Sequence, residues 1–212
     1  MNQTRFAYVQ IGANDYKALA DFYVKALGFT ICKDTAWLDG KEGICLAAPG
    51  FESGTAPVFG FVPASKGSSA NINDAGFAHT CYETNDVKAA VKQLLKCGGS
   101  IHSTMKNAEA HPCVYCKDPE GNVVEFHIPF PAEKTAGELA NTAACLLGLK
   151  PEKNLRKGNA QGAMKFIHVN IICPDWSKLC GFYRTVFGCV NTGSQKDHQG
   201  SYKEQVIGVP NV

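Results

Sequence analysis

Apolar and polar residues follow the same order three times along the chain. Near the N-terminus, apolar residues show strand-like spacing over 6–11 and then recur at helical spacing over 16–27. The segments 77–99 and 165–188 repeat this order. We therefore predict three copies of a strand that is followed by a helix.

The ends of the three predicted helices carry the same two markers. An aspartate precedes each helix, where a carboxylate caps the first turn by accepting a backbone N–H. A glycine follows thirteen residues later, where many helices end in a left-handed conformation. The aspartates are Asp15, Asp86 and Asp175, and the glycines are Gly28, Gly99 and Gly188.

The first and third copies are the most similar pair. A shift of 160 positions places Phe6 on Phe166, and it places Phe22-Tyr23 on the corresponding pair of the third copy. A fixed spacing of this kind indicates that one folding unit is repeated. In each copy one residue stands seven positions before the aspartate, and these residues are Tyr8, His79 and His168.

Further strand-like segments follow the first two helices. Three follow each helix, and the last two of the second set are joined by the turn-forming string 118–122. Each unit is therefore a strand, a helix and three more strands, which makes the predicted fold class α+β. The predicted strands are 29–34, 43–49, 56–64, 100–105, 111–117 and 122–128.

The pattern also predicts how the chain is divided. Residues 1–130 form one module of two units, 5–62 and 77–130. Residues 131–163 are a helical, lysine-rich connector. Residues 164–212 begin a second module, which stops before the fourth strand of its unit and is therefore incomplete.

Composition excludes several classes of function. The chain has 45% apolar and 19% charged residues, which is typical of a soluble globular protein. A net charge of +2 argues against nucleic acid as a partner. No apolar run has the length of a signal peptide or a membrane span, so we expect no membrane association and a cytoplasmic protein.

The ten cysteines are scattered along the chain rather than arranged as a disulfide framework. Most fall within apolar strand or helix patterns, so we expect small buried hydrophobic side chains in a reducing compartment. Cys113 and Cys116 have the spacing of a metal knuckle. Because no second pair accompanies them, we do not predict a structural zinc site there.

Three features together resemble the vicinal oxygen chelate superfamily, which contains glyoxalase I, extradiol dioxygenases and bleomycin-resistance proteins. They are the position seven before the aspartate, the Phe-Tyr pair before the helix-ending glycine, and the closing string DPEGNVVEF at 118–126. The resemblance implies paired βαβββ modules that form a curved mixed sheet around a cleft. It also implies one divalent metal ion in that cleft.

The resemblance places metal ligands on the first and fourth strands of each unit. The second unit has His79 and Glu125 at these positions. The first unit has Tyr8 where histidine or glutamine is usual, and Phe59 or a neighbour where glutamate is usual. We expect Tyr8 and Phe59 to line the substrate cleft of a unit without a metal ion, although Tyr8 also suits a core position.

His168 occupies the lost ligand position in the third unit. If that unit faces the second, the metal ligands are His79, Glu125 and His168, with zinc, nickel, iron or manganese as the ion. A lone histidine on an apolar strand is more often a hydrogen-bonded core residue. Glu125 is harder to explain in that way, because buried carboxylates rarely lack a partner.

The remaining histidines have weaker signals. His127 shares a strand face with Glu125, where it could replace a ligand or form a salt link. His102, His111 and His198 match no position of the repeat, and we expect them to be exposed.

The resemblance implies a lactoylglutathione-lyase-like, metal-dependent lyase or isomerase that acts on a small substrate with vicinal oxygens. Glu125 is then the catalytic residue that carries the proton. One alternative is an extradiol-type ferrous dioxygenase, and another is a metal-free binding protein of the bleomycin-resistance type. The unpaired strand edge of the incomplete unit predicts a homodimer or a mobile tail after about Lys165.

Overall fold

The structure is a computed structural model, and it describes residues 6–51, 57–65, 75–103, 112–128, 164–192, 196–197 and 203–209. The expectations for the connector 131–163, for His111 and for His198 lie outside these residues.

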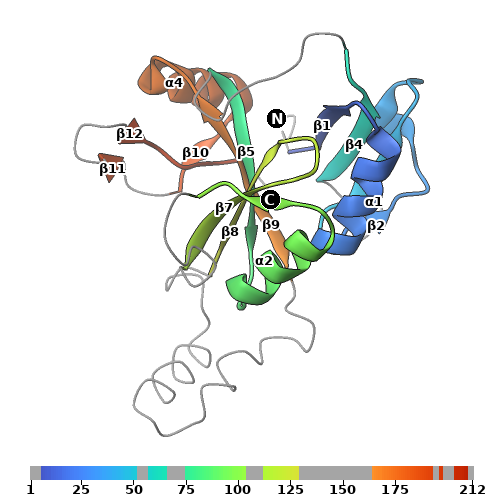
Figure 1. Ribbon diagram of the computed structural model, residues 1–212. Helices are drawn as coiled ribbons and strands as arrows, with labels where there is room; N and C mark the ends of the chain where they lie inside the picture. Colours follow the sequence, from blue (N-terminus) through green and yellow to red (C-terminus); the bar gives the residue numbers. More distant parts are fainter. Residues whose placement is uncertain are drawn as a thin grey trace, which may run out of the picture.

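Helices and strands appear in the predicted order, and the α+β fold class is confirmed (Figure 1). The first copy contains β1 (Tyr8–Ala13), α1 (Tyr16–Leu27), β2 (Thr30–Ile31), the 3-10 helix η1 (Ala36–Leu38), β3 (Ile44–Ala47) and β4 (Val58–Pro63). The second contains β5 (Gly76–Glu83), α2 (Val87–Lys96), β6 (Ser100–Ile101), β7 (Cys113–Lys117) and β8 (Val123–His127). The third contains β9 (Lys165–Ile172), α4 (Trp176–Phe187), β10 (Val190–Asn191), β11 (Lys196–Asp197), β12 (Lys203–Glu204) and β13 (Ile207–Gly208).

The three helices begin as predicted. The carboxylate before each helix accepts the backbone N–H three residues later, which satisfies one donor of the first turn. The donors are the backbone amides of Ala18, Ala89 and Lys178.

The helix ends agree with prediction in two of three cases. Gly28 and Gly188 are left-handed, with φ of 76° and 69°. The prediction for Gly99 is wrong, because α2 ends earlier and the positive φ of 99° belongs to Gly98. Gly99 has a packing role instead, since an added Cβ would lie 2.4 Å from the Leu94 side chain.

The strands form two main mixed sheets. The first has the order β1-β4-β3-β2, with β1 and β4 parallel. The second has five strands in the order β6-β7-β8-β5-β9, with β5 parallel to β8 and antiparallel to β9. The third copy is therefore joined to the second by its first strand. Two short ladders, β10-β13 and β11-β12, complete the described strands.

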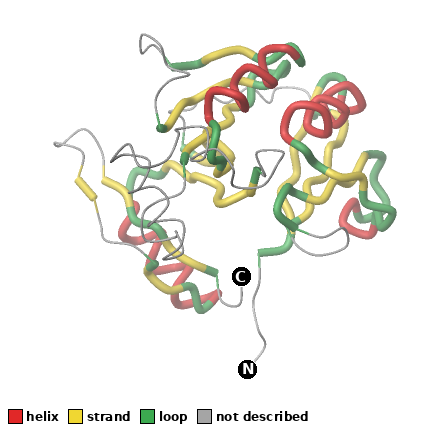
Figure 2. The backbone as a smooth tube through the Cα atoms, turned by 90° about the horizontal axis from the view of Figure 1, so that it is seen from below, coloured by secondary structure: helices red, strands yellow, loops and turns green. Residues whose placement is uncertain are grey.

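The two sheets lie side by side around a shared interior. In Figure 1 the first sheet and α1 are on the right, the five-stranded sheet is central, and α4 is at the upper left. Figure 2 shows the helices toward the outside of the strands. Helix α1 packs on α2, so the helices of the first two copies are neighbours. None of the described helices is long and apolar enough to cross a membrane.

One apolar core connects all three copies. It contains side chains from both sheets and from α1 and α2, and Phe166 of β9 enters it with only 5% of its surface exposed. The Phe166 ring lies 5.3 Å from that of Phe59 and 5.8 Å from that of Tyr82. Burial of one such ring contributes about 2–3 kcal/mol, so Phe166 fixes the third copy to the others.

Polar contacts tie the first copy to the turn before β8. The Tyr23 hydroxyl donates to Oδ2 of Asp118 at 3.1 Å within the core. Glu120 accepts from the Asn14 side-chain amide at 2.7 Å and from the Asp15 backbone N–H at 3.0 Å. The turn that aligns β8 is therefore fixed by residues of the first copy.

Helix α4 is packed differently from its counterpart α1. Phe182 is 51% exposed, whereas Phe22 at the same position of α1 is 4% exposed. Helix α1 packs on β3, β4 and α2, and no described strand or helix covers α4 to that extent. The described part of the third copy therefore presents an apolar helix face to solvent.

Candidate functional site

Three strands of the five-stranded sheet bring their side chains to one face. In the ladder, Cys81 of β5 lies opposite both Glu125 of β8 and His168 of β9. Residues two apart on a strand share a face, so His79 joins this group. The register therefore places His79, Glu125 and His168 together, although they come from two copies of the repeat.

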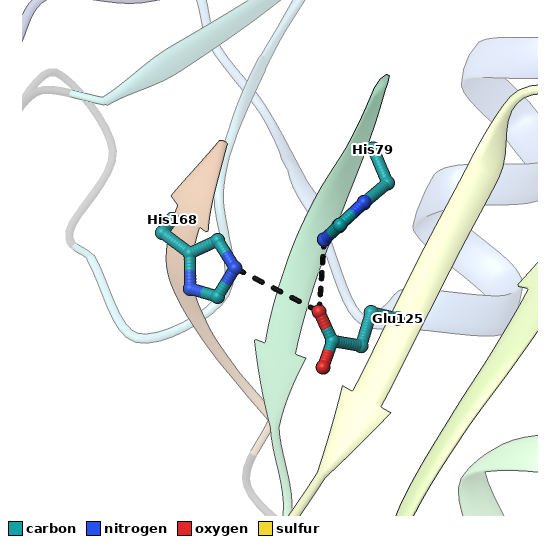
Figure 3. A group of neighbouring side chains, drawn as sticks. All are labelled: His79, Glu125 and His168. Carbon is teal, nitrogen blue, oxygen red and sulfur yellow. Dashed lines mark ion pairs between the residues drawn. The ribbon is translucent and has the colours of Figure 1, made fainter. Parts of the chain in front are cut away.

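The side chains of these three residues converge (Figure 3). Nε2 of His79 lies 2.9 Å from Oε2 of Glu125, and Nε2 of His168 lies 3.7 Å from the same oxygen. One donor atom from each residue can be chosen so that all lie within 4.8 Å of one another. The histidine of the third copy thus reaches the site of the second, as the sequence suggested.

The site is buried on one side and open on the other. The side chains of His79 and Glu125 are 8% and 11% exposed, whereas that of His168 is 38% exposed. Of these three residues, His168 is therefore the most exposed to solvent.

Electrostatics keep Glu125 ionised. Burial raises the pKa of its carboxyl, but the adjacent His79 imidazole, the hydrogen bond from Cys113 and the charge of His168 outweigh this effect. The pKa of Glu125 is lowered to about 2. Burial also lowers the pKa of His168 below its ordinary value, although the Glu125 charge opposes that shift. The carboxylate is charged at neutral pH, and the imidazole of His168 favours its neutral form.

Strand β7 adds side chains that the sequence did not single out for this site. The Cys113 thiol donates to Oε1 of Glu125 at 3.1 Å. The Tyr115 ring lies edge-on to His79, with the ring centres 5.3 Å apart. The sequence signal that could have revealed them is the alternating pattern of 113–117, which precedes the strand that carries Glu125. Residues at alternate positions of a strand face the same side, so Cys113 and Tyr115 share one face.

The two cysteines of β7 face opposite sides of the sheet. Cys113 is half-buried beside Glu125, whereas Cys116 is fully buried in the core. Side chains on opposite sides of one strand cannot share a metal ion. Each cysteine that the structure describes is a free thiol.

Two other histidines lie outside the group of three. His127 is buried on the same strand face as Glu125, and its Nδ1 lies 2.6 Å from the carbonyl oxygen of Ile128. His102 is half-buried rather than exposed, so that expectation was wrong. Its backbone N–H extends the β6-β7 ladder by donating to the Tyr115 carbonyl.

The first copy has no matching donor set among its described residues. Tyr8 is 45% exposed and its ring lies 5.8 Å from that of Trp37, so it faces outward rather than into the core. Phe59 is fully buried against Phe29 and Phe166, which corrects its expected place in a cleft.

Strand register explains the correction. Tyr8 pairs with Val58 as His79 pairs with Val123. Gly60, two positions beyond Val58, is therefore the counterpart of Glu125. Phe59 is one position off, and a shift of one residue turns a side chain to the other face.

A sequence model of the Glyoxalase/Bleomycin resistance protein/Dioxygenase superfamily matches residues 5–126. The chain belongs to this superfamily. No curated protein matches it in sequence.

Solved structures of glyoxalase I from Zea mays share the fold of this superfamily member. The enzyme is 16% identical over 97% of this chain and 63% of its own, with a TM-score of 0.64. A mutant of the same enzyme is 14% identical over 98% and 64%, with a TM-score of 0.63. The chain thus spans less than two thirds of these proteins, and at such identity the likeness shows the fold alone.

The three residues of this superfamily member fit a divalent metal ion. Ligand atoms bound at about 2.1 Å lie roughly 3.0–3.4 Å apart, close to the contacts of Glu125 with the two histidines. Nε2 of His79, the ring nitrogen that faces Glu125, is buried and makes no hydrogen bond to any described residue. A buried imidazole with so few partners is costly, and a bound ion would offset that cost.

Proposed function

We propose that the chain binds one divalent metal ion through His79, Glu125 and His168 and acts as a glyoxalase-like lyase or isomerase. The observation that supports the proposal most strongly is the convergence of these three side chains within 4.8 Å. Two imidazoles and one carboxylate leave coordination positions open for a substrate. The substrate class that we propose is a small molecule with neighbouring oxygen atoms.

Each residue has a distinct part in this proposal. The two buried residues, His79 and Glu125, would hold the ion on the buried side of the site. His168 completes the set at the side that is open to solvent. Glu125 is also the proposed proton carrier, because it is the one acid among the three and is ionised at neutral pH. A bound divalent ion supplies Lewis-acid polarisation of substrate oxygens.

Metal content tests the first part of the proposal. The protein is exposed in turn to nickel, zinc, iron(II) and manganese, and bound metal is measured by mass spectrometry. We expect about one ion per chain in the wild type and a clear loss in His79→Ala and His168→Ala. His102→Ala is the control that keeps the ion. A wild-type chain that binds none of these metals contradicts the proposal.

Turnover tests the second part. The hemithioacetal of methylglyoxal and glutathione is supplied to the metal-loaded protein, and thioester formation is followed by absorbance. We expect Glu125→Gln to abolish turnover. If the metal-loaded protein leaves the hemithioacetal unchanged, the glyoxalase-like reaction is contradicted, but the proposed metal site is not.

An extradiol-type ferrous dioxygenase is the second candidate. The observation in its favour is the donor set itself, since two histidines and one carboxylate with open positions also suit non-haem iron(II). The iron-loaded protein would then consume oxygen with a catechol, and oxidation of the iron would stop the reaction.

A metal-free binding protein is the third candidate, and it is favoured by the first copy. Gly60 stands at the counterpart of Glu125, so that copy lacks the carboxylate. For a metal-free binding protein, we expect the affinity for a small apolar ligand to be the same with and without a metal chelator.

We also propose that the protein is a cytoplasmic homodimer. The exposed apolar side chains of α4, such as Phe182, support the dimer because they gain stability when a partner covers them. The free thiols of the described cysteines suit a reducing compartment. Sedimentation that shows a monomer at micromolar concentration contradicts the dimer.

A further inference from the structure

The two oxygens of Glu125 have different partners. Oε2 faces the imidazoles of His79 and His168, at 2.9 Å and 3.7 Å. Oε1 accepts a hydrogen bond from the Cys113 thiol at 3.1 Å. The carboxylate is therefore held from two sides, and its orientation depends on a residue outside the three candidate ligands.

The register explains how Cys113 reaches Glu125. Tyr115 of β7 is directly opposite Glu125, and Cys113 is opposite His127, two positions further along. Diagonal neighbours of this kind lie within reach of side chains on the same face. Cys113 therefore approaches Glu125 from the side, at the oxygen that faces away from the histidines.

We propose that Cys113 is a positioning residue that holds the Glu125 carboxylate so that Oε2 alone is presented to a metal ion. This inference rests on the proposed metal site. A glutamate has three side-chain torsions, and ordering them costs entropy when an ion binds. A carboxylate that is already oriented avoids most of that cost, and for this reason residues around metal ligands affect affinity.

A weak donor such as a thiol is sufficient for this role. The S–H group donates weakly, so it orients the carboxylate and leaves most of the negative charge available to the ion. Cys113 is not itself in the group of donor atoms that could hold a metal among the described residues. Its effect on the ion therefore acts through Glu125.

The test compares metal affinity in Cys113→Ala, Cys113→Ser and the wild type by competition with a chromogenic chelator. We expect alanine to weaken binding by about 10–100-fold, as loss of an outer contact commonly does. Serine keeps a donor, and we expect it to stay within about threefold of the wild type because a hydroxyl can make the same hydrogen bond. The absorption spectrum of bound cobalt(II) should change in the alanine variant, which a purely structural role would not cause.

Cys116→Ala is the matched control. Cys116 is on the same strand but faces the core on the other side of the sheet. We expect its variant to lower thermal stability without changing metal affinity or the cobalt spectrum. Equal affinity and spectra for wild type and Cys113→Ala overturn the inference, as does a serine variant that binds as poorly as the alanine variant.

A measurement on the metal-free protein separates this inference from the proposed function. The S–H stretching band of Cys113 is isolated as the infrared difference between the wild type and Cys113→Ser. We expect the band to move to higher wavenumber in Glu125→Ala, because the hydrogen bond is lost. An unmoved band overturns the inference even if metal binds. If the band shifts in Glu125→Ala as expected but the wild type binds no metal, the hydrogen bond is real and the proposed function is overturned. The metal role of Cys113 is then overturned with it.

Discussion

Phe6 and Phe166 hold the same position in two copies of the repeat, and their rings stack with centres 6.0 Å apart. The contact joins the start of the first copy to the start of the third. It is part of the core that also includes Phe59 and Tyr82. Equivalent residues of a repeated unit thus pack on one another where the two sheets meet.

Replacement of Phe166 by alanine should therefore destabilise the whole protein. Loss of a buried phenylalanine costs about 3–5 kcal/mol in the free energy of unfolding, because it leaves a cavity. Ile31→Ala is the control, since this side chain is 69% exposed and its loss should cost about 0.5 kcal/mol or less. Urea unfolding measures both. Equal effects of the two variants would show that Phe166 does not join the copies.

The buried hydrogen bond between Tyr23 and Asp118 gives a second prediction. Tyr23→Phe removes the hydroxyl and should lower the free energy of unfolding by about 1 kcal/mol. Tyr16→Phe is the matched control, because its hydroxyl bonds Glu42 on the surface. We expect the control to have a smaller effect in thermal unfolding. A larger loss in Tyr16→Phe than in Tyr23→Phe would contradict this prediction.

The stability of the metal-free protein should fall on acidification. The pKa of Glu125 drops from 4.5 to about 2 in the folded state, so its contribution is present above pH 4.5 and is lost as the pH falls toward 2. The pKa of His168 is also lowered from 6.5, so the unfolded chain binds more protons near and below that pH. Both effects lower the stability of the folded protein as the pH falls.

Thermal unfolding between pH 8 and pH 4 in the presence of a chelator measures this dependence. We expect the midpoint temperature to decrease from about pH 6.5 downward, with a shallower decrease in His168→Gln. An identical pH profile for the variant and the wild type would show that His168 does not contribute.

The cap of α2 gives a fourth prediction. Asp86 accepts the Ala89 backbone N–H at 2.9 Å. Asp86→Ala should lower the free energy of unfolding by about 1 kcal/mol, because an N–H of the first turn loses its partner. Lys92→Ala, at an exposed position of the same helix, is the control and should change stability by about 0.5 kcal/mol or less. Guanidinium unfolding compares the two variants.

Local signals in the sequence predicted much of the fold. The three aspartate caps could be located because a carboxylate before an apolar helical pattern has a local function. The strands could be located from apolar spacing and turn residues. The end of α2 was misplaced, because the sequence does not distinguish a glycine needed for its φ, Gly98, from one needed for close packing, Gly99.

The candidate site was only partly predictable. The repeat placed His79 and His168 at equivalent positions, and Glu125 stood out as an acid in an apolar run. Strand register is a tertiary property, and the sequence alone did not show that Gly60 rather than Phe59 corresponds to Glu125. Cys113 was missed as a contact of Glu125, because only the register of β7 on β8 shows that its thiol lies close to that carboxylate.

In the described part of the chain, the ladder between β5 and β9 joins the second and third copies, which carry His79 and His168. An ion held by both histidines would cross-link the two strands, because separating them would require the ion to lose a ligand. Metal binding should then raise the force needed to separate β9 from β5. The same binding event would complete the proposed active site and strengthen this strand pair mechanically.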